Sequence, residues 1–234
     1  MFNKLCNWFT QWLVLWVLLA GMLGYFYPNF LIIFKPYTEW LFTFTMFGIG
    51  CVLTIKDFLP ILKKPQEVIL GVIAQFTIMP FLGFTLAKLI NLSPEITLGV
   101  ILVGSVPGAM ASNVISYLAN ADVAYSVALT SVSTFLSPLL TPTFVYIFAH
   151  SIIQIKFVEM FFSIIRMVIF PLISGMMLRH FLKERIKRIK SLFPALSCVF
   201  IAFICGLVVA LNKDYLKKIT HLIFLVVFFH NFLG

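Results

Sequence analysis

Oxygen-bearing side chains gather around a break in an apolar segment of this chain. Residues 104–113 read G-S-V-P-G-A-M-A-S-N, so Ser112 and Asn113 follow Pro107 within two turns. Pro107 has no N–H to donate and its ring clashes with the preceding turn, so the carbonyl of Val103 loses its helical partner. Such a break persists in hydrocarbon only where it is buried in protein or lines a polar cavity. The segment therefore predicts a binding site; the alternative is a proline kink that neighbouring helices satisfy.

A row of hydroxyls follows in the next apolar segment. Ser126, Thr130 and Thr134 are spaced i, i+4, i+8 and share one helical face, with Ser137 nearby. Asp122 stands where it can cap this helix. A hard cation such as sodium takes several oxygen ligands, which these hydroxyls and those of the break could supply. The alternative is that each hydroxyl bonds the carbonyl four residues earlier in its own helix.

A sodium ion in a medium of low dielectric also needs a compensating negative charge. All eight acidic residues fall at or near the ends of the apolar segments: Glu39, Asp57, Glu67, Glu95, Asp122, Glu159, Glu184 and Asp214. A carboxylate at mid-membrane would be costly and usually functional. The predicted sodium site therefore lacks a compensating negative charge within this sequence.

Other kinds of site have little support. The cysteines and histidines show no metal-ligand spacing; the cysteines are expected to be packing residues, and the histidines stand near the ends of apolar segments. No motif brings together a nucleophile, a base and an orienting group. We therefore expect neither an enzyme nor a bound cofactor, and the one metal that the residues suggest is sodium, through the oxygen ligands described above.

The composition indicates a polytopic membrane protein. Apolar residues make up 62% and charged residues 11% of the sequence, and the mean hydropathy is +1.07, values that disfavour a soluble globular domain. Because about 20 apolar residues cross a bilayer, the sequence predicts roughly eight spanning segments. Their approximate ranges are 8–27, 37–55, 68–90, 95–120 with the break at Pro107, 122–148, 157–180, 191–211 and 219–234.

The distribution of Lys and Arg indicates the orientation. Ten fall on the side of the N-terminus: Lys4, Lys56, Lys63, Lys64, Arg179, Lys183, Arg185, Lys187, Arg188 and Lys190. Six fall on the other side: Lys35, Lys88, Lys156, Lys213, Lys217 and Lys218. Arg166 falls inside the sixth span. The positive-inside rule then predicts a cytoplasmic N-terminus in the cell (inner) membrane, and basic loops explain the net charge of +9 without nucleic acid.

A short charged sequence occurs twice and suggests an internal repeat, with coincidence as the alternative. Residues 56–64 read K-D-F-L-P-I-L-K-K and residues 213–218 read K-D-Y-L-K-K, and Asp57 and Asp214 are 157 residues apart. An odd number of spans separates the copies, as an inverted repeat requires. The same offset puts the counterpart of Gly104 at about position 261, beyond the last residue. Inverted-repeat transporters bind their substrate between two discontinuous helices, one from each repeat. We therefore expect this sequence to hold one of the two, and its last span to be cut in mid-helix.

Residues 105–142, which read S-V-P-G-A-M-A-S-N-V-I-S-Y-L-A-N-A-D-V-A-Y-S-V-A-L-T-S-V-S-T-F-L-S-P-L-L-T-P, resemble the bile acid:sodium symporter family. Its bacterial members carry a P-G-G-x-A-S-N-V pattern followed by A-L-S-V-A-x-T-x-x-S-T. The resemblance extends in order and spacing to H-N-F-L-G at residues 230–234. It implies an all-α polytopic membrane protein, an inverted-repeat transporter fold with a discontinuous fourth helix, of which this chain holds about eight of ten spans.

The resemblance also implies a domain organisation. Residues 1–150 would form a first five-helix repeat, broken at 104–113, and residues 151–234 an incomplete second repeat of spans 6 to 8. Panel-type spans would lie in residues 8–55 and 157–211. Core-type spans would lie in residues 68–148 and 219–234, and the core would move against the panel.

The family's functional positions carry over by motif. The implied sodium ligands are Ser112, Asn113, Ser126, Thr130 and, in A-Q-F-T-I-M-P of the third span, Gln75. The implied substrate contacts are the backbone N–H groups where the helix restarts, at Gly108, Ala109, Met110 and Ala111, which would face a carboxylate. Ala109 and Met110 depart from the family's glycine and small residue, which favours a narrower or more apolar pocket. The family's E-V-G-M-Q-N-like motif of the ninth span is absent from this sequence.

The implied function is sodium-coupled symport, by alternating access, of an organic anion that is bile-acid-like or a small carboxylate such as pantoate. Two alternatives stay open. One is a truncated, non-transporting membrane protein that lacks the second crossover helix. The other is a proton-coupled or passive carrier of the same fold. The expected partners are sodium, the organic anion and the lipid bilayer.

Overall fold

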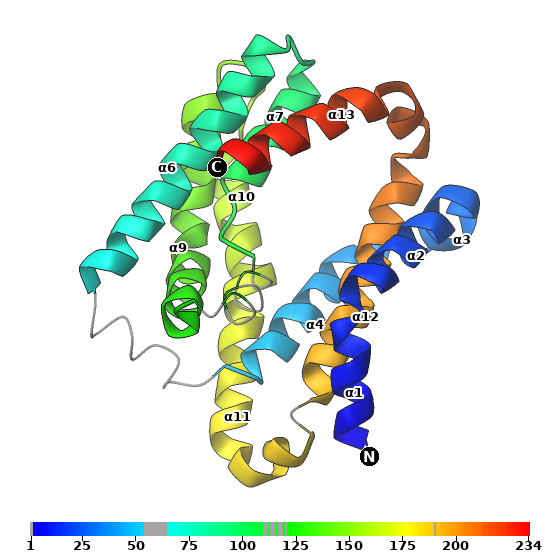
Figure 1. Cartoon of the computed structure of the whole chain (residues 1–234), viewed down its shortest axis with the longest axis vertical. Helices are drawn as coiled ribbons and strands as arrows, with labels where there is room; N and C mark the ends of the chain where they lie inside the picture. Colours follow the sequence, from blue (N-terminus) through cyan, green and yellow to red (C-terminus); the bar gives the residue numbers. More distant parts are fainter. Residues whose placement is uncertain are drawn as a thin grey trace. The chain divides into compact units, whose positions relative to one another are not determined.

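The computed structural model describes an all-helical chain in two units (Figure 1). Unit 1 is Met1–Leu53 with Ile165–Thr220, and unit 2 is Thr54–Ile164 with His221–Gly234. The described residues are 2–53, 65–109, 112, 116, 119, 121–189 and 191–234, and the side chains of 2–4, 7, 183–189 and 217–220 are left out. No strand occurs in these ranges, so the predicted all-α class is confirmed.

Unit 1 is built around α12 (Leu192–Leu211), which packs against α1 (Phe2–Gln11), α2 (Leu13–Phe26), α3 (Pro28–Ile32) and α4 (Thr38–Gly50). The unit also holds η1 (Lys35–Tyr37), the π-helical turn η3 (Ile165–Ile169), α11 (Phe170–Ile189) and the start of α13 (Lys213–Leu233). Glycines let α2 and α12 approach closely: a β-carbon on Gly24 would collide with the carbonyl of Gly206. Small residues are the usual means of close contact between membrane helices.

Unit 2 holds α6 (Pro65–Leu89), α7 (Pro94–Gly104), α9 (Val123–Ala149), α10 (Phe157–Ile164) and the second part of α13. Helix α6 packs on α7 and α9, and α9 also packs on α10. Ile101, Val145 and Ala149 are completely buried where α7 meets α9. Helix α6 is followed by Asn91 at φ 54°, a left-handed conformation that asparagine tolerates.

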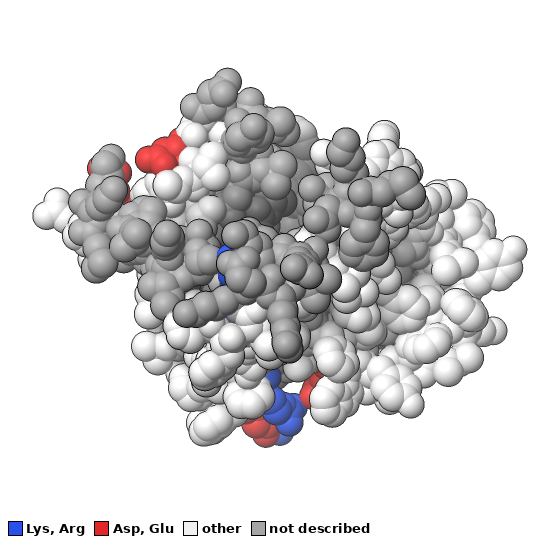
Figure 2. All heavy atoms as spheres, turned by 90° about the horizontal axis from the view of Figure 1, so that it is seen from below, with Lys and Arg blue, Asp and Glu red and all other residues white. Residues whose placement is uncertain are grey.

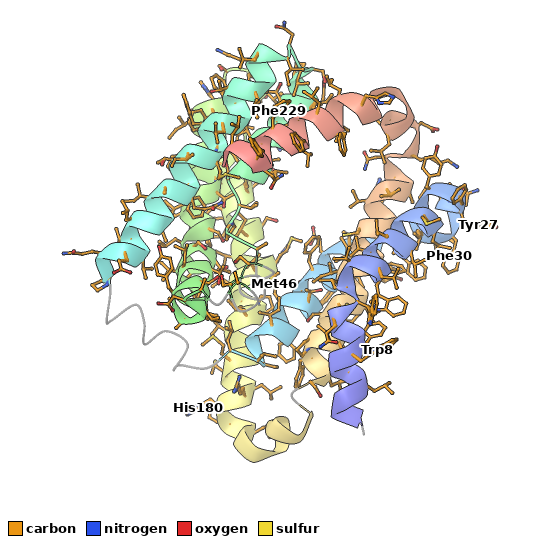
Figure 3. The ribbon with its side chains drawn as sticks, in the orientation of Figure 1. Trp8, Tyr27, Phe30, Met46, His180 and Phe229 are labelled. Carbon is orange, nitrogen blue, oxygen red and sulfur yellow. The ribbon has the colours of Figure 1, made fainter. Side chains whose placement is uncertain are left out.

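The helices suit a membrane. Four are long and apolar enough to cross it, Pro65–Leu89, Val123–Ala149, Phe157–Leu182 and Leu192–Leu211, and Leu13–Phe26, Pro94–Gly104 and His221–Leu233 are shorter apolar helices; this search covered the described residues. Most of the described surface in Figure 2 is uncharged. Figure 3 shows Tyr27 and Phe30 projecting outward near the turn from α2 to α3, and tyrosine is a residue that favours membrane interfaces.

Several predicted boundaries were wrong. The predicted first span, 8–27, contains the end of α1 and the whole of α2, with Trp12 between them. In the second span α4 ends at Gly50, and the described residues 51–53 that follow are not helical, although the prediction ran to residue 55. The residues between the predicted sixth and seventh spans, 181–190, are helical to Ile189, because Lys, Arg and Glu have high helix propensity. The second charged echo forms the first turns of α13, so the last helix begins at Lys213 rather than near 219.

Candidate functional site

The break in the fourth apolar segment is confirmed. Helix α7 ends at Gly104, and the described residues that follow, 105–109, are not helical. The backbone N–H of Ser105 donates to Ile101 O at 2.9 Å and to Leu102 O at 3.0 Å. Its hydroxyl also donates to Ile101 O, at 2.7 Å. The helix stops before Pro107 because a proline disfavours helical geometry in the residue that precedes it.

Gln75 connects α6 to this break. Its side-chain Nε2 donates to the backbone oxygen of Val106, at 3.3 Å. Val106 lies in the non-helical segment, where a carbonyl has no regular partner. Gln75 is half-buried, and its side-chain oxygen is an acceptor that this bond does not use. The structure thus brings together two predicted features, the glutamine of the third span and the break.

Ser112 and Ser126 place two hydroxyl oxygens side by side. Their Oγ atoms are 3.4 Å apart, although the residues are 14 positions apart in the chain. Ser112 Oγ also donates to Ala109 O at 2.7 Å, so its proton is engaged and its lone pairs stay available as acceptors. A hard cation such as calcium lies about 2.4 Å from each ligand oxygen, and at that distance two oxygens 3.4 Å apart subtend about 90°. This separation suits two adjacent ligands of one ion.

Thr130 lies one turn further along α9 and is buried. A β-carbon on Gly108 would lie 3.6 Å from its Cγ2, so the residue packs against the break. Its hydroxyl lies 3.0 Å from Ser126 O and 3.1 Å from Val127 O. The hydroxyl proton is therefore donated within α9, which is the alternative that the sequence left open for the hydroxyl row. The hydroxyl oxygen still has lone pairs with which it could bind a cation.

The rest of the hydroxyl row also bonds carbonyls of its own helix. Thr134 Oγ1 donates to Thr130 O at 2.7 Å, and Ser137 Oγ donates to Thr134 O at 2.7 Å. The second bond has a specific cause. Pro138 lies inside α9 and has no N–H, so the carbonyl of Thr134 lacks its helical donor and Ser137 supplies one.

The first turn of α9 is held in place from two directions. Asp122 is the N-cap, and its Oδ1 accepts from the backbone N–H of Tyr125 at 3.0 Å, so the predicted cap is confirmed. The Tyr125 hydroxyl donates to Glu67 O on α6 at 3.1 Å. These contacts fix Ser126, which follows Tyr125, relative to α6.

Not every predicted site residue can be placed. Asn113, Met110 and Ala111 lie outside the described residues. Gly108 is half-buried and Ala109 is exposed, and Ala109 contributes its carbonyl to Ser112. Among the residues that the structure describes, no group of three or more His, Cys, Asp and Glu could hold a metal.

The end of α7 adds a favourable field for a cation. A helix C-terminus carries a partial negative charge from its unsatisfied carbonyls, and α7 ends at Gly104, immediately before the segment that Gln75 holds. Discontinuous helices bind coupling ions in this way, through unwound carbonyls and C-terminal helix ends.

Sequence reasoning missed several groups at the site. The carbonyls of Val106 and Ala109 are acceptors here, and residue type gives no signal for a backbone oxygen. Tyr125 was missed as the residue that anchors α9 to α6. Its place next to the capping Asp122, on the turn that precedes the hydroxyl row, was the available signal.

The family model and the similar proteins agree on one family for this chain. A model described as the Sodium Bile acid symporter family matches residues 40–219. The chain is 37% identical over 232 residues to a protein of Bacillus subtilis (strain 168) named "Uncharacterized sodium-dependent transporter YocS". It is 32% identical over 201 residues to the Arabidopsis thaliana protein named "Probable sodium/metabolite cotransporter BASS1, chloroplastic".

The matches cover different shares of the relatives. The bacterial alignment covers 99% of this chain and 72% of its relative. The Arabidopsis alignment covers 86% of this chain and 50% of its relative. The chain therefore spans about half the length of the plant protein.

Proposed function

The chain belongs to the Sodium Bile acid symporter family, and on that basis we propose that it functions in sodium-coupled symport of an organic anion. The substrate class proposed is a bile-acid-like anion or a small carboxylate such as pantoate. The names of the relatives, a sodium-dependent transporter and a sodium/metabolite cotransporter, support sodium coupling. We further propose a multi-pass protein of the cell membrane with a cytoplasmic N-terminus.

The observation that carries the proposal is the pair of serine hydroxyls beside the helix break. Ser112 and Ser126 present oxygens 3.4 Å apart, and Thr130 packs against the same segment. Together with Asn113 and the amide oxygen of Gln75, they form the proposed sodium site. Hard cations are bound by oxygen ligands of these types.

The backbone that restarts after the break forms the proposed anion site. Its N–H groups, at residues 108–111, would face the carboxylate of the substrate, because a helix N-terminus attracts negative charge. An ion and an anion bound on either side of one break would each lower the electrostatic cost of the other, which couples their binding.

Alternating access is proposed as a movement of the two units. Unit 1 holds residues of the predicted panel, and unit 2 holds residues of the predicted core together with the proposed site. The inverted repeat of residues 1–150 and 151–234 remains part of this proposal.

Uptake by the purified chain in proteoliposomes tests the function. Labelled taurocholate and pantoate are supplied with an inward sodium gradient, with potassium in place of sodium as the matched control. We expect uptake that depends on sodium. Uptake that is equal in sodium and potassium would favour a proton-coupled or passive carrier. No uptake, together with no sodium-induced change in thermal stability, would favour a non-transporting membrane protein.

A further inference from the structure

A buried histidine ties the last helix of the chain to α6. His230 lies on α13 and is only 2% exposed. Its ring Nε2 is 3.0 Å from the backbone oxygen of Met79, which lies on α6, 151 residues away in the chain. Because a carbonyl oxygen can only accept, Nε2 must carry the proton of this hydrogen bond. The end of α13 lies across α6 and α7 in Figure 1, consistent with this contact.

The end of α7 lies against the Met79–Pro80 peptide of α6. A β-carbon on Gly104, the last residue of α7, would lie 2.6 Å from Met79 O and 2.9 Å from Pro80 N. Pro80 lies inside α6 and has no N–H, so this turn of α6 lacks one backbone hydrogen bond. The histidine therefore bonds a locally weakened turn at the point where α7 ends.

The helices leave a specific space for the imidazole. A β-carbon on Gly83 would lie 3.4 Å from His230 Nε2 and 3.0 Å from the carbonyl of Val100 on α7. With glycine at this position, α6, α7 and the imidazole can approach one another. Two glycines, Gly83 and Gly104, thus permit the same three-helix contact.

Two parts of the proposed sodium site, Gln75 on α6 and the non-helical segment after α7, lie next to this contact. Gln75 is one helical turn before Met79 on α6, and Val106, whose carbonyl it bonds at 3.3 Å, is two residues after Gly104. The position of the Met79–Pro80 peptide relative to α7 therefore sets whether Gln75 can reach the break. Residues 75–79 of α6 are thus held at one end by the bond from His230 to Met79 O, and at the other end by the bond from Gln75 to Val106 O.

We propose that His230 is a positioning residue for the sodium site. By donating from Nε2 to Met79 O, it fixes the turn of α6 that faces the end of α7, and so holds Gln75 and the break in register. The inference rests on the proposed function for its sodium readout, and it predicts a structural effect that needs no sodium.

The first test compares His230→Leu with His230→Gln. Glutamine can place an amide N–H near the position of Nε2, whereas leucine fills space without a donor. We expect the leucine variant to raise the sodium concentration for the half-maximal gain in thermal stability about five- to tenfold, because it loses one buried hydrogen bond. The glutamine variant should stay within about twofold of the wild type. Asn231→Ala is the matched control, since Asn231 is exposed and bonds Val227 O of its own helix.

The second test uses hydrogen exchange in potassium. His230→Leu should speed exchange of the amides at 75–83 and 104–109 about fivefold or more relative to His230→Gln, while α9 amides at 139–149 stay unchanged. Equal exchange in both variants would overturn the inference, whatever the sodium result. A wild type without any sodium response would instead reject the proposed function. A leucine variant that loses stability in potassium but keeps the wild-type sodium response would show a purely structural histidine and also overturn the inference.

Discussion

Replacing Ser126 with alanine removes one oxygen of the proposed sodium pair. Ser126 is half-buried in the first turn of α9, and its hydroxyl is 3.4 Å from that of Ser112. The backbone of this turn is held by the Asp122 cap and the Tyr125 hydroxyl, which the substitution leaves in place. Ser133→Ala is the matched control, because Ser133 is a buried serine of the same helix whose hydroxyl donates to Thr130 O at 3.0 Å.

The size of the effect follows from the geometry. A hydroxyl at one of two adjacent ligand positions makes a charge-assisted contact with the ion, and such contacts contribute about 1.5–3 kcal/mol. Since about 1.4 kcal/mol corresponds to a tenfold change, Ser126→Ala should raise the dissociation constant for sodium about ten- to hundredfold. Ser133→Ala loses a hydroxyl bond within its own helix and should leave the sodium affinity within about twofold.

Thermal unfolding in detergent or nanodiscs gives the measurement, with potassium chloride at the same ionic strength as the reference. At a sodium concentration of about 100 times the dissociation constant, the wild type should gain about 2.7 kcal/mol of stability. A variant that binds about tenfold more weakly should gain about 1.4 kcal/mol at the same concentration. For a chain of this size the wild-type shift in Tm is then roughly 5–10 °C, and the variant's is about half of it.

One result would refute the reasoning. If Ser126→Ala and Ser133→Ala shift the sodium response equally, then the hydroxyl pair is not a sodium site, and the 3.4 Å approach is a packing contact. A sodium response that is unchanged in both variants would lead to the same conclusion. A lower Tm of Ser126→Ala in potassium does not interfere, because each variant is compared with itself in the two salts.

Three further predictions concern the surroundings of the site. Gln75→Leu removes the donor to Val106 O and should weaken sodium binding about two- to fivefold by the same assay. Gln75→Glu is the comparison, because it keeps a side-chain oxygen for the ion. Equal weakening by both substitutions would contradict an oxygen ligand at this position. Gly104→Val places a side chain against the Met79–Pro80 peptide and should lower the free energy of unfolding by about 1–3 kcal/mol, which an unchanged Tm would exclude. Asp122→Ala removes the N-cap of α9 and should cost about 1 kcal/mol in potassium, whereas Asp122→Asn should restore most of it; no difference between them would mean that the cap contributes little.

Much of the helix content could be predicted from the sequence, because long apolar segments in a membrane have few alternatives to helices. The boundaries of α6, α9 and α12 lie within about three residues of the predicted spans, since proline, asparagine and aspartate mark their ends. The ends of α4, α11 and α13 were predicted poorly. In α11 and α13 charged residues continue the helix beyond the apolar segment, and hydropathy gives no signal for that.

The candidate site could be predicted in part. The break at Pro107 and the cap at Asp122 are local features, set by a missing N–H and by a short acidic side chain, and the structure confirms both. That Gln75 would meet the break could be expected only through the family resemblance. The oxygen chemistry of Ser112 and of the hydroxyl row suggested from the sequence that they could share a cation, but the 3.4 Å approach of Ser112 to Ser126 depends on how the segments pack. His230 gave no such signal, since the sequence places it near the end of a span, whereas the structure buries it against α6.

The sequence alone determined that this is a helical membrane protein with one interrupted helix, because hydropathy and proline act over a few residues. The tertiary structure decided which oxygens lie together. Val106 O, Met79 O and the two serine hydroxyls come from segments between 14 and 151 residues away from their partners. Contacts at such separations depend on how helices pack, and Gly83 and Gly104 permit the close approach of α6 and α7 here.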